Sequence, residues 1–300
     1  MVQLFVTKKQ EIELICNLAG VCPNDIRLYD KGYLSRGYVI NDGEIVFKFP
    51  KQDFVKYDNE AMVLGFLDNT NFVNELNINL QRVNQAWTDE KDFRYIGFHG
   101  VRGESVSDMF KKDKITPKQA RGIGKQIAKF LLKLHAQQVE TTVCKTLDDE
   151  IKEMLRIWQG RKLYAKEIFD KNFTEQEQMM MDKLVTNYVP TKLGELGERL
   201  VFSHGDMHEG NTFIDGIGKV GLIDFDNAGY YDEARDFMRV DDDDILNAML
   251  DAYNDNITFR QKVEIRREII RPLTMLAQNL FPDDYLQRAK ETVKKYYKIC

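Results

Sequence analysis

Three oxygen-bearing side chains in residues 201–226 stand at intervals that could serve one chemical step. Asp206 follows a histidine and a glycine, Asn211 comes five residues later, and Asp224 ends a hydrophobic stretch. A carboxylate can accept a hydrogen bond from a substrate hydroxyl and then take its proton. An amide oxygen and a second carboxylate suit a hard divalent ion that keeps water and phosphate in its other positions. The set therefore indicates metal-assisted phosphoryl transfer.

A tight turn would bring the amide and the second carboxylate together. If the turn centres on Gly216 and Ile217, antiparallel pairing puts Asn211 opposite Leu222, and Asp224 lies one diagonal step away. Such diagonal neighbours are about 7 Å apart. The sequence therefore predicts a β-hairpin that holds both groups at one edge.

A purely structural role and a zinc site both fit these residues less well. Asp, Asn and Gly fill loops in most proteins, so each residue alone could simply form a turn. The joint pattern His-Gly-Asp-x-x-x-x-Asn followed by Ile-Asp-Phe-Asp is much more specific. His204 and His208 have a spacing that suits zinc on a helix, yet glycines lie beside them and no third ligand is evident.

An upstream pair of charged residues fits the same chemistry. Lys48 lies in a predicted strand, where it can reach the phosphates of a nucleotide, and Glu60 lies twelve residues later on a predicted helix. There Glu60 can pair with Lys48 and orient its ammonium group toward the phosphates. Considered alone, each of the two is a typical surface residue. The loop of residues 31–37 would cover the phosphates with its backbone N–H groups and the Ser35 hydroxyl, despite lacking a G-x-G-x-x-G pattern.

The elements that must position these residues follow from hydrophobic periodicity and turn signals. The first hundred residues alternate strands with one helix: a hairpin at 38–49 about Asn41-Asp42-Gly43 and ended by Pro50, a helix at 53–67, and a strand at 93–98. The remainder is mainly helical, with capped helix starts at Thr116 and Thr174, a β-containing segment at 200–225, and breaks near 254–256, Pro272 and Pro282. The pattern predicts an α+β fold, a small mixed lobe joined to a larger helical one.

Composition excludes several other classes of protein. The 300 residues are 43% hydrophobic and 30% charged, which rules out a disordered chain. The net charge of −5 argues against a nucleic-acid binder. No apolar run is long enough to cross a membrane, and the four cysteines form no Cys-x-x-Cys pair, as expected of reduced thiols. We expect a soluble, cytoplasmic protein without nucleic-acid or membrane partners.

At these residues the sequence resembles the aminoglycoside phosphotransferase family, which is related to choline kinases and distantly to protein kinases. The resemblance covers most of the chain and is strongest in the Asp206, Asn211 and Asp224 motifs. Residues 47–51, 231–237 and 241–244 look most like the 2″-phosphotransferases. The resemblance implies a bilobal protein-kinase-like fold: a nucleotide-binding lobe with an antiparallel sheet at 1–98, a connector at 99–104, and a helical lobe at 105–300.

The same resemblance implies a role for each site residue. Asp206 is then the catalytic aspartate, Mg²⁺ is held by Asn211 and Asp224, and the phosphates of ATP or GTP are bound by Lys48 with Glu60 as its partner. The backbone carbonyl of His99 and the N–H of Val101 would bind the purine base.

Two positions depart from the family pattern. Asp226 stands where many relatives have glycine or glutamate, so an extra acid lies near the metal. Gly100 lacks the side chain common in the connector, which predicts an open base pocket.

Residues 231–256 carry nine acids against Arg235 and Arg239, a charge of about −7 compared with −5 for the whole chain. An acidic wall beside the transfer centre would attract a polycationic alcohol such as an aminoglycoside. Equally, four aspartates before Ile245 would favour a helix N-terminus whatever the substrate. The expected substrate contacts are Asp206, Asp232, Asp241, Asp242 and Asp243, while Asp236 is expected to brace the catalytic loop.

The sequence thus predicts a resistance-type kinase that transfers the γ-phosphate of ATP or GTP to an aminoglycoside hydroxyl, acting as a monomer or weak dimer. Two alternatives stay open. The acceptor could be choline, a macrolide, a sugar or an amino alcohol, or the chain could bind nucleotide without catalysis.

Overall fold

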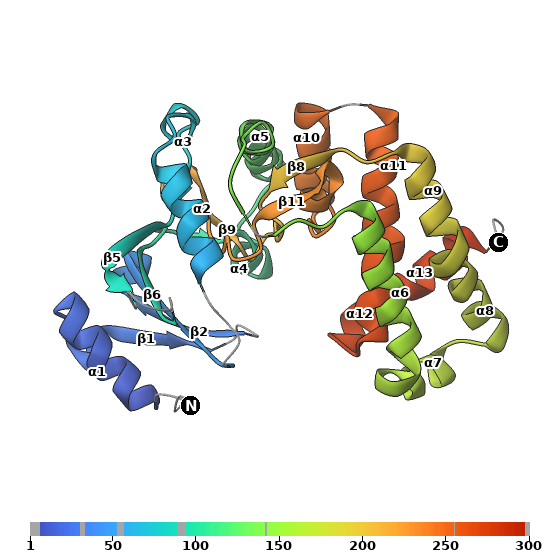
Figure 1. The fold of residues 1–300 in the computed structure, drawn as a ribbon, viewed down its shortest axis with the longest axis horizontal. Coiled ribbons are helices and arrows are strands. Elements are labelled where there is room, and N and C mark those ends of the chain that lie inside the picture. The colour runs from blue at the N-terminus through green and yellow to red at the C-terminus, as the bar shows by residue number, and fades with distance from the viewer. Residues whose placement is uncertain are drawn as a thin grey trace.

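The computed structural model describes residues 7–30, 34–52, 57–88, 94–141, 143–254 and 256–297. A sheet with helices packed on it forms one side of the molecule, and helices form most of the other (Figure 1). The predicted α+β fold, with a small mixed lobe and a larger helical lobe, is confirmed. No described helix is both long enough and apolar enough to cross a membrane. The residue limits of the lobes and of the connector stay predictions.

The N-terminal sheet positions Lys48. Its strands are antiparallel throughout, in the order β1 (Ile26–Tyr29), β2 (Ser35–Ile40), β3 (Ile45–Pro50), β6 (Ile96–His99) and β5 (Arg82–Thr88). Helix α1 (Lys8–Ala19) buries Ile15 in one cluster with Tyr38 and Phe47. Because successive side chains alternate across a strand, Lys48 points to the opposite face, where α2 (Asp58–Asp68) lies.

The local predictions in this lobe hold with shifted limits. The hairpin is confirmed as β2 and β3, joined through Asn41 and Asp42, whose φ angles are 49° and 52°. Ser35 and Gly37 already belong to β2, so the loop before it is shorter than predicted; residues 31–33 lie outside the described residues. Residues 53–56 and 93 do too, and the helix and strand predicted there are described from Asp58 and from Ile96.

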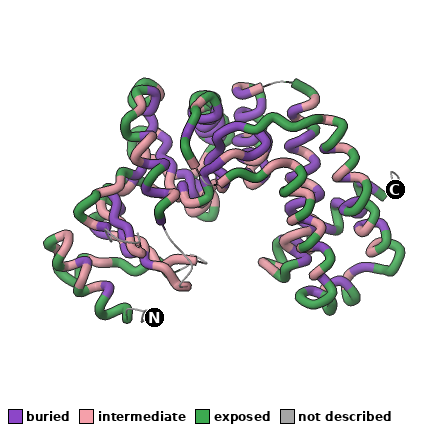
Figure 2. The backbone as a smooth tube through the Cα atoms, viewed as in Figure 1, coloured by how far each residue is buried: buried purple, intermediate pink, exposed green. Residues whose placement is uncertain are grey.

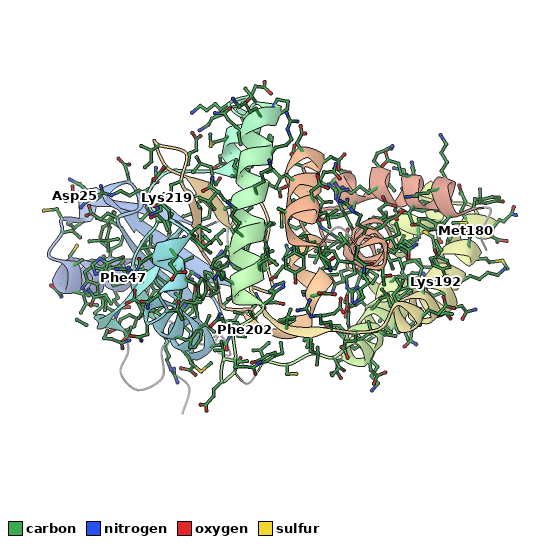
Figure 3. The ribbon with its side chains drawn as sticks, turned by 90° about the horizontal axis from the view of Figure 1, so that it is seen from above. Asp25, Phe47, Met180, Lys192, Phe202 and Lys219 are labelled. Atoms are coloured by element: carbon green, nitrogen blue, oxygen red, sulfur yellow. The ribbon has the colours of Figure 1, made fainter. Side chains whose placement is uncertain are left out.

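The helices of the larger lobe pack around two apolar clusters, the first of which also includes residues of α2 and β6. Buried residues run along the facing sides of the helices (Figure 2). Figure 3 shows Phe202 at the foot of the long α5, between the half that holds Phe47 and the half that holds Met180. The helices of the described chain after α2 are α3 (Phe72–Glu75), α4 (Val106–Lys111), α5 (Pro117–Leu134), α6 (Leu147–Tyr164), α7 (Lys166–Asn172), α8 (Glu175–Lys183), α9 (Val189–Leu196), α10 (Asp243–Tyr253), α11 (Ile257–Ile265), α12 (Arg271–Ala277) and α13 (Pro282–Tyr296). The predicted caps at Thr116 and Thr174 are confirmed.

Pro272 does not break its helix, contrary to the sequence prediction. The chain stays helical from α11 to α12 through a π-helical turn at Arg266–Ile270. A proline lacks an N–H and collides with the carbonyl four residues earlier in a regular helix. The wider π turn directly before it removes that conflict. A second π turn, Leu184–Tyr188, precedes Pro190 in the same way.

Short strands between the helices position Asn211 and Asp224. β9 (Thr212–Ile214) and β10 (Val220–Leu222) form the expected hairpin, flanked by β4 (Asn79–Leu80) and β7 (Glu104–Ser105). The register is one residue from the predicted one, because Thr212, not Asn211, lies opposite Leu222. The backbone of Asn211 instead accepts a hydrogen bond from Ile223 N at 3.1 Å. Asp224 is the next residue, so the predicted proximity survives.

The loop after β8 (Leu200–Ser203), which pairs with β11 (Gly229–Asp232), is held by one buried carboxylate. Asp236 accepts hydrogen bonds from the backbone N–H groups of His204 and Gly205, at 2.9 and 2.8 Å, and lies 3.0 Å from His135 Nε2. Burial opposes the charge, but these partners outweigh it and hold the pKa of Asp236 below its ordinary 3.8. This contact fits the expected bracing role.

Gly100 lies in close contact with the backbone of the turn between β2 and β3. Its N–H donates to Glu44 O at 2.8 Å, and a Cβ added to Gly100 would overlap the carbonyl of Gly43. The turn between β2 and β3 therefore packs against Gly100, which also lines a cavity of about 600 Å³ with His99 and Val101, so the open base pocket stays a prediction.

Gly100→Ala is expected to destabilise the protein by about 1–3 kcal/mol, because the new methyl group must displace backbone. Gly122→Ala is the matched control: it lies on α5, has open space around it, and should stabilise by about 0.5–1 kcal/mol. Urea unfolding of both variants measures the difference. Equal stability of the two would disprove the close packing at Gly100.

Asp236→Asn should cost about 1–3 kcal/mol near pH 7, because an amide has one acceptor oxygen where the carboxylate has two. The pKa of Asp236 is lowered in the folded state, so its contribution exists above the ordinary pKa and is lost as pH falls through the folded value. The gap between wild type and variant should therefore narrow below about pH 3.8.

Urea unfolding at several pH values measures this gap. Asp148→Asn, at a side chain 72% exposed, is the control and should change stability by less than about 0.5 kcal/mol. A gap that stays constant down to about pH 2 would contradict the assignment.

Candidate active site

Lys48 joins two carboxylates from distant parts of the chain. Its Nζ lies 2.8 Å from Glu60 Oε1 on α2 and 2.6 Å from Asp224 Oδ1, which follows β10. The side chain of Lys48 is 13% exposed and that of Glu60 is fully buried. Burial alone would lower the pKa of Lys48, but Asp224 and Glu60 outweigh it and raise that pKa. The predicted pairing of Lys48 with Glu60 is confirmed.

The carboxylates around Lys48 outnumber the positive charge it supplies. The pKa of Asp226 is raised to about 8, because of its burial and then because of Asp224 and Glu60 nearby. Asp224 has a φ of 70°, unusual for a residue with a side chain, and its N–H donates to Gln81 Oε1 at 3.2 Å. The extra acid expected at Asp226 is therefore near the centre, where a further cation would relieve the repulsion.

These residues fit a magnesium ion. Asn211 is buried and its Nδ2 donates to Asp206 O at 3.0 Å, which fixes the amide beside the end of β10. Within the described ranges, no three His, Cys, Asp or Glu side chains are arranged to hold a metal ion by themselves. An ion between Asn211 and Asp224 would therefore take other ligands from water and phosphate, as magnesium does.

Asp206 has a partner that sequence reasoning missed. Its Oδ1 accepts a hydrogen bond from Nη1 of Arg239, while its Oδ2 lies 3.9 Å from His208 Nε2. Burial lowers the pKa of His208 to about 4, so the imidazole is neutral near pH 7. Arg239 entered the sequence analysis only as a countercharge, since no motif spacing marks it.

The phosphate-covering residue Ser35 lies at the start of β2, where its Oγ accepts a hydrogen bond from Tyr57 Oη at 2.9 Å. Tyr57 directly precedes α2, so Ser35 is tied to the helix that carries Glu60. The role of Ser35 toward phosphate stays a prediction.

His99 and Val101 line a cavity of about 600 Å³ beside the connector, together with Glu44, Arg82 and Asp215. Neither Lys48 nor Asp206 lines this cavity. Among the described residues, this cavity therefore holds the expected base-binding residues without the expected phosphate-binding ones, and the base contacts stay predictions.

Asp232 does not face a substrate, contrary to the sequence prediction. Its side chain is 1% exposed and forms ion pairs with Lys262 and Arg266, each at 3.2 Å. It also accepts the N–H of Ala234 and so caps the turn that follows β11. Asp232 is part of a buried ionic network.

The acidic run at 241–244 is not an unpaired wall. Asp241 pairs with Arg271 and Arg288, each at 2.7 Å, and Asp243 pairs with Arg267 at 2.7 Å. Asp242 caps α10 by accepting the N–H of Ile245 at 2.9 Å. The helix-terminus role therefore holds for Asp242, while Asp241 and Asp243 have arginine partners, and the substrate contacts expected at these three aspartates stay predictions. The partners come from α12, α13 and the π turn, too far along the chain for a local charge count.

Solved structures of phosphotransferases share this fold. An aminoglycoside 2″-phosphotransferase in complex with GDP and kanamycin superposes with a TM-score of 0.71 at 16% identity, covering 96% of this chain and 98% of that one. A macrolide 2′-phosphotransferase from Brachybacterium faecium gives 0.59 at 15%, covering 95% and 97%. A choline/ethanolamine kinase family protein from Mesorhizobium loti gives 0.58 at 14%, covering 94% and 92%. The predicted kinase-like bilobal fold is thereby confirmed.

No curated protein sequence matches the chain. The sequence profile of the phosphotransferase enzyme family, APH, matches residues 25–256, a range that contains Lys48, Glu60, Asp206, Asn211 and Asp224. With this match and the shared fold, the chain belongs to the phosphotransferase enzyme family.

Proposed function

We propose that the protein is a magnesium-dependent O-phosphotransferase that moves the γ-phosphate of ATP or GTP to a hydroxyl of an aminoglycoside. The observation that carries the proposal is the contact of Lys48 with both Glu60 and Asp224, which joins two lobes at one charged centre. Related folds have been solved with ADP, with GDP and kanamycin, and with ATP and streptomycin. These ligands support the choice of donor and acceptor.

On the donor side, Lys48 binds the α- and β-phosphates, and Glu60 keeps its ammonium group aimed at them. Asn211 and Asp224 hold the magnesium ion, which when bound neutralises phosphate charge. Ser35 contributes its hydroxyl near the phosphates, and the base meets the carbonyl of His99 and the N–H of Val101. Lys48 also contacts Asp224 directly, so a bound phosphate would share the ammonium group with this carboxylate.

On the acceptor side, Asp206 orients the hydroxyl and takes its proton. The acceptor oxygen forms the new bond to the γ-phosphorus, the bond to the bridging oxygen breaks, and the nucleoside diphosphate leaves with that electron pair. Asp236 keeps the loop of Asp206 in place through the N–H groups of His204 and Gly205.

A second candidate function is the same phosphate transfer to a different class of acceptor. The pairing of Asp241 and Asp243 with arginines removes the unpaired acidic wall that would favour a polycation. This observation favours a neutral or singly charged alcohol, and the macrolide and choline kinases that share the fold supply examples.

Asp206→Asn is expected to reduce phosphate transfer about 10²–10⁴-fold, because the amide cannot take the acceptor proton. Binding of nucleotide should be retained, since Asp206 lies on the acceptor side. Asp148→Asn makes the same chemical change at an exposed position on α6 and is the control. Transfer that survives Asp206→Asn undiminished would rule out the proposed role.

An acceptor panel tests the substrate class. Kanamycin, a macrolide, choline, a sugar and an amino alcohol are each incubated with γ-labelled ATP or GTP, with magnesium and with excess chelator. We expect label on one acceptor class and its loss with chelator. Magnesium-dependent nucleotide binding with no labelled product across the panel would favour a non-catalytic protein.

A further inference from the structure

The two carboxylate oxygens of Asp206 have different surroundings. Oδ1 is held by the guanidinium of Arg239, whereas Oδ2 faces the imidazole of His208 at 3.9 Å, beyond hydrogen-bond distance. The side chain of Asp206 is 16% exposed and that of Arg239 is 30% exposed. One oxygen is therefore occupied, and the other has no hydrogen-bond partner among the described residues.

The backbone beside Arg239 is fixed without help from Asp206. Arg267 Nε donates to Val240 O at 3.1 Å, and Arg271 Nη1 donates to Met238 O at 3.4 Å. The N–H groups of Asp241 and Asp242 donate to Glu209 Oε1, at 2.7 and 2.9 Å. Because Glu209 lies three residues after Asp206, the loop and the segment 238–242 form one braced unit.

The side chain of Arg239, in contrast, has little else to hold it. Its Nε is buried and, within the part of the chain that the structure describes, has no hydrogen-bond partner. A buried N–H without a partner is unfavourable. The contact of the guanidinium with Asp206 compensates this cost and so keeps the side chain in its position. A planar guanidinium on one oxygen also fixes the plane and the rotamer of the carboxylate.

We propose that Arg239 is a positioning residue: it clamps Oδ1 of Asp206 so that Oδ2 points to the acceptor hydroxyl. This rests on the proposed role of Asp206. Once the clamp is removed, Asp206 samples several rotamers, and only one of them can take the proton of the acceptor. The loss should therefore fall on kcat and leave the KM for nucleotide unchanged.

The experiment compares Arg239→Ala and Arg239→Lys with Arg235→Ala. Arg235 is a matched control, because it lies four residues before Arg239 and its Nε is also buried without a described partner, but its guanidinium stacks on Tyr231, 5.3 Å from the ring centroid. Two rates are measured for each variant: transfer from MgATP to kanamycin, and hydrolysis of MgATP with water as acceptor. Thermal unfolding shows whether each variant folds.

We expect Arg239→Ala to lower kcat about 10- to 100-fold at an unchanged KM for MgATP, within the range that a positioned proton acceptor contributes. Arg239→Lys should recover part of the loss, and millimolar guanidinium should rescue Arg239→Ala but not Arg235→Ala or Asp206→Asn. Crystal structures add a readout without turnover: one rotamer of Asp206 in the wild type and several in Arg239→Ala.

A folded Arg239→Ala with the wild-type kcat, or with Asp206 still in one rotamer, would overturn the proposal. So would a loss that guanidinium and lysine leave untouched and that Arg235→Ala reproduces, because that pattern is merely structural. Failure of the proposed function has a different signature: either the wild type itself transfers no phosphate, or Asp206→Asn keeps the wild-type rate whatever residue stands at position 239.

Discussion

The ammonium group of Lys48 is the charge on which the rest of the centre depends. Glu60 is buried completely, and a buried carboxylate without a partner is strongly unfavourable. Lys48 satisfies it, and the same ammonium reaches Asp224 from the other lobe. Removing one member of such a buried pair typically costs about 3–5 kcal/mol. The side chain of Lys48 therefore couples the sheet, α2 and the β9–β10 hairpin. The same ammonium charge that would bind phosphate also holds these elements together.

On the acceptor side, too, charged groups with internal partners hold the site in place, here around Asp206. Asp236 fixes the backbone of the loop, Glu209 joins that loop to the following segment, and Arg239 occupies one oxygen of Asp206. Each of these side chains has a partner inside the protein, so the loop that carries Asp206 is held at three points. Proton transfer needs such rigidity, because a donor and an acceptor must meet at hydrogen-bond distance.

The sequence was informative where the signal is local. The strand at Lys48 and the helix at Glu60, read together with the downstream motif, were enough to predict that these residues pair, and the hairpin register was wrong by a single residue. It failed where the partner is remote: Arg271 lies thirty residues beyond Asp241, so a charge count over one window overstated the acidity of that face. It failed as well at Pro272, because a π turn is not visible in periodicity. Arg239 carries no spacing signal, and only the fold places it beside Asp206.

The parallel pairing of β4 with β10 bears on how the two halves can move. β4 precedes the connector in sequence, yet it shares a sheet with the hairpin that ends at Asp224. This pairing thus links the halves at a place besides the predicted connector at 99–104. Separating the halves at this point would break the hydrogen bonds between β4 and β10. The position of Lys48 relative to Asp224 is therefore constrained by this strand pairing as well as by the predicted connector.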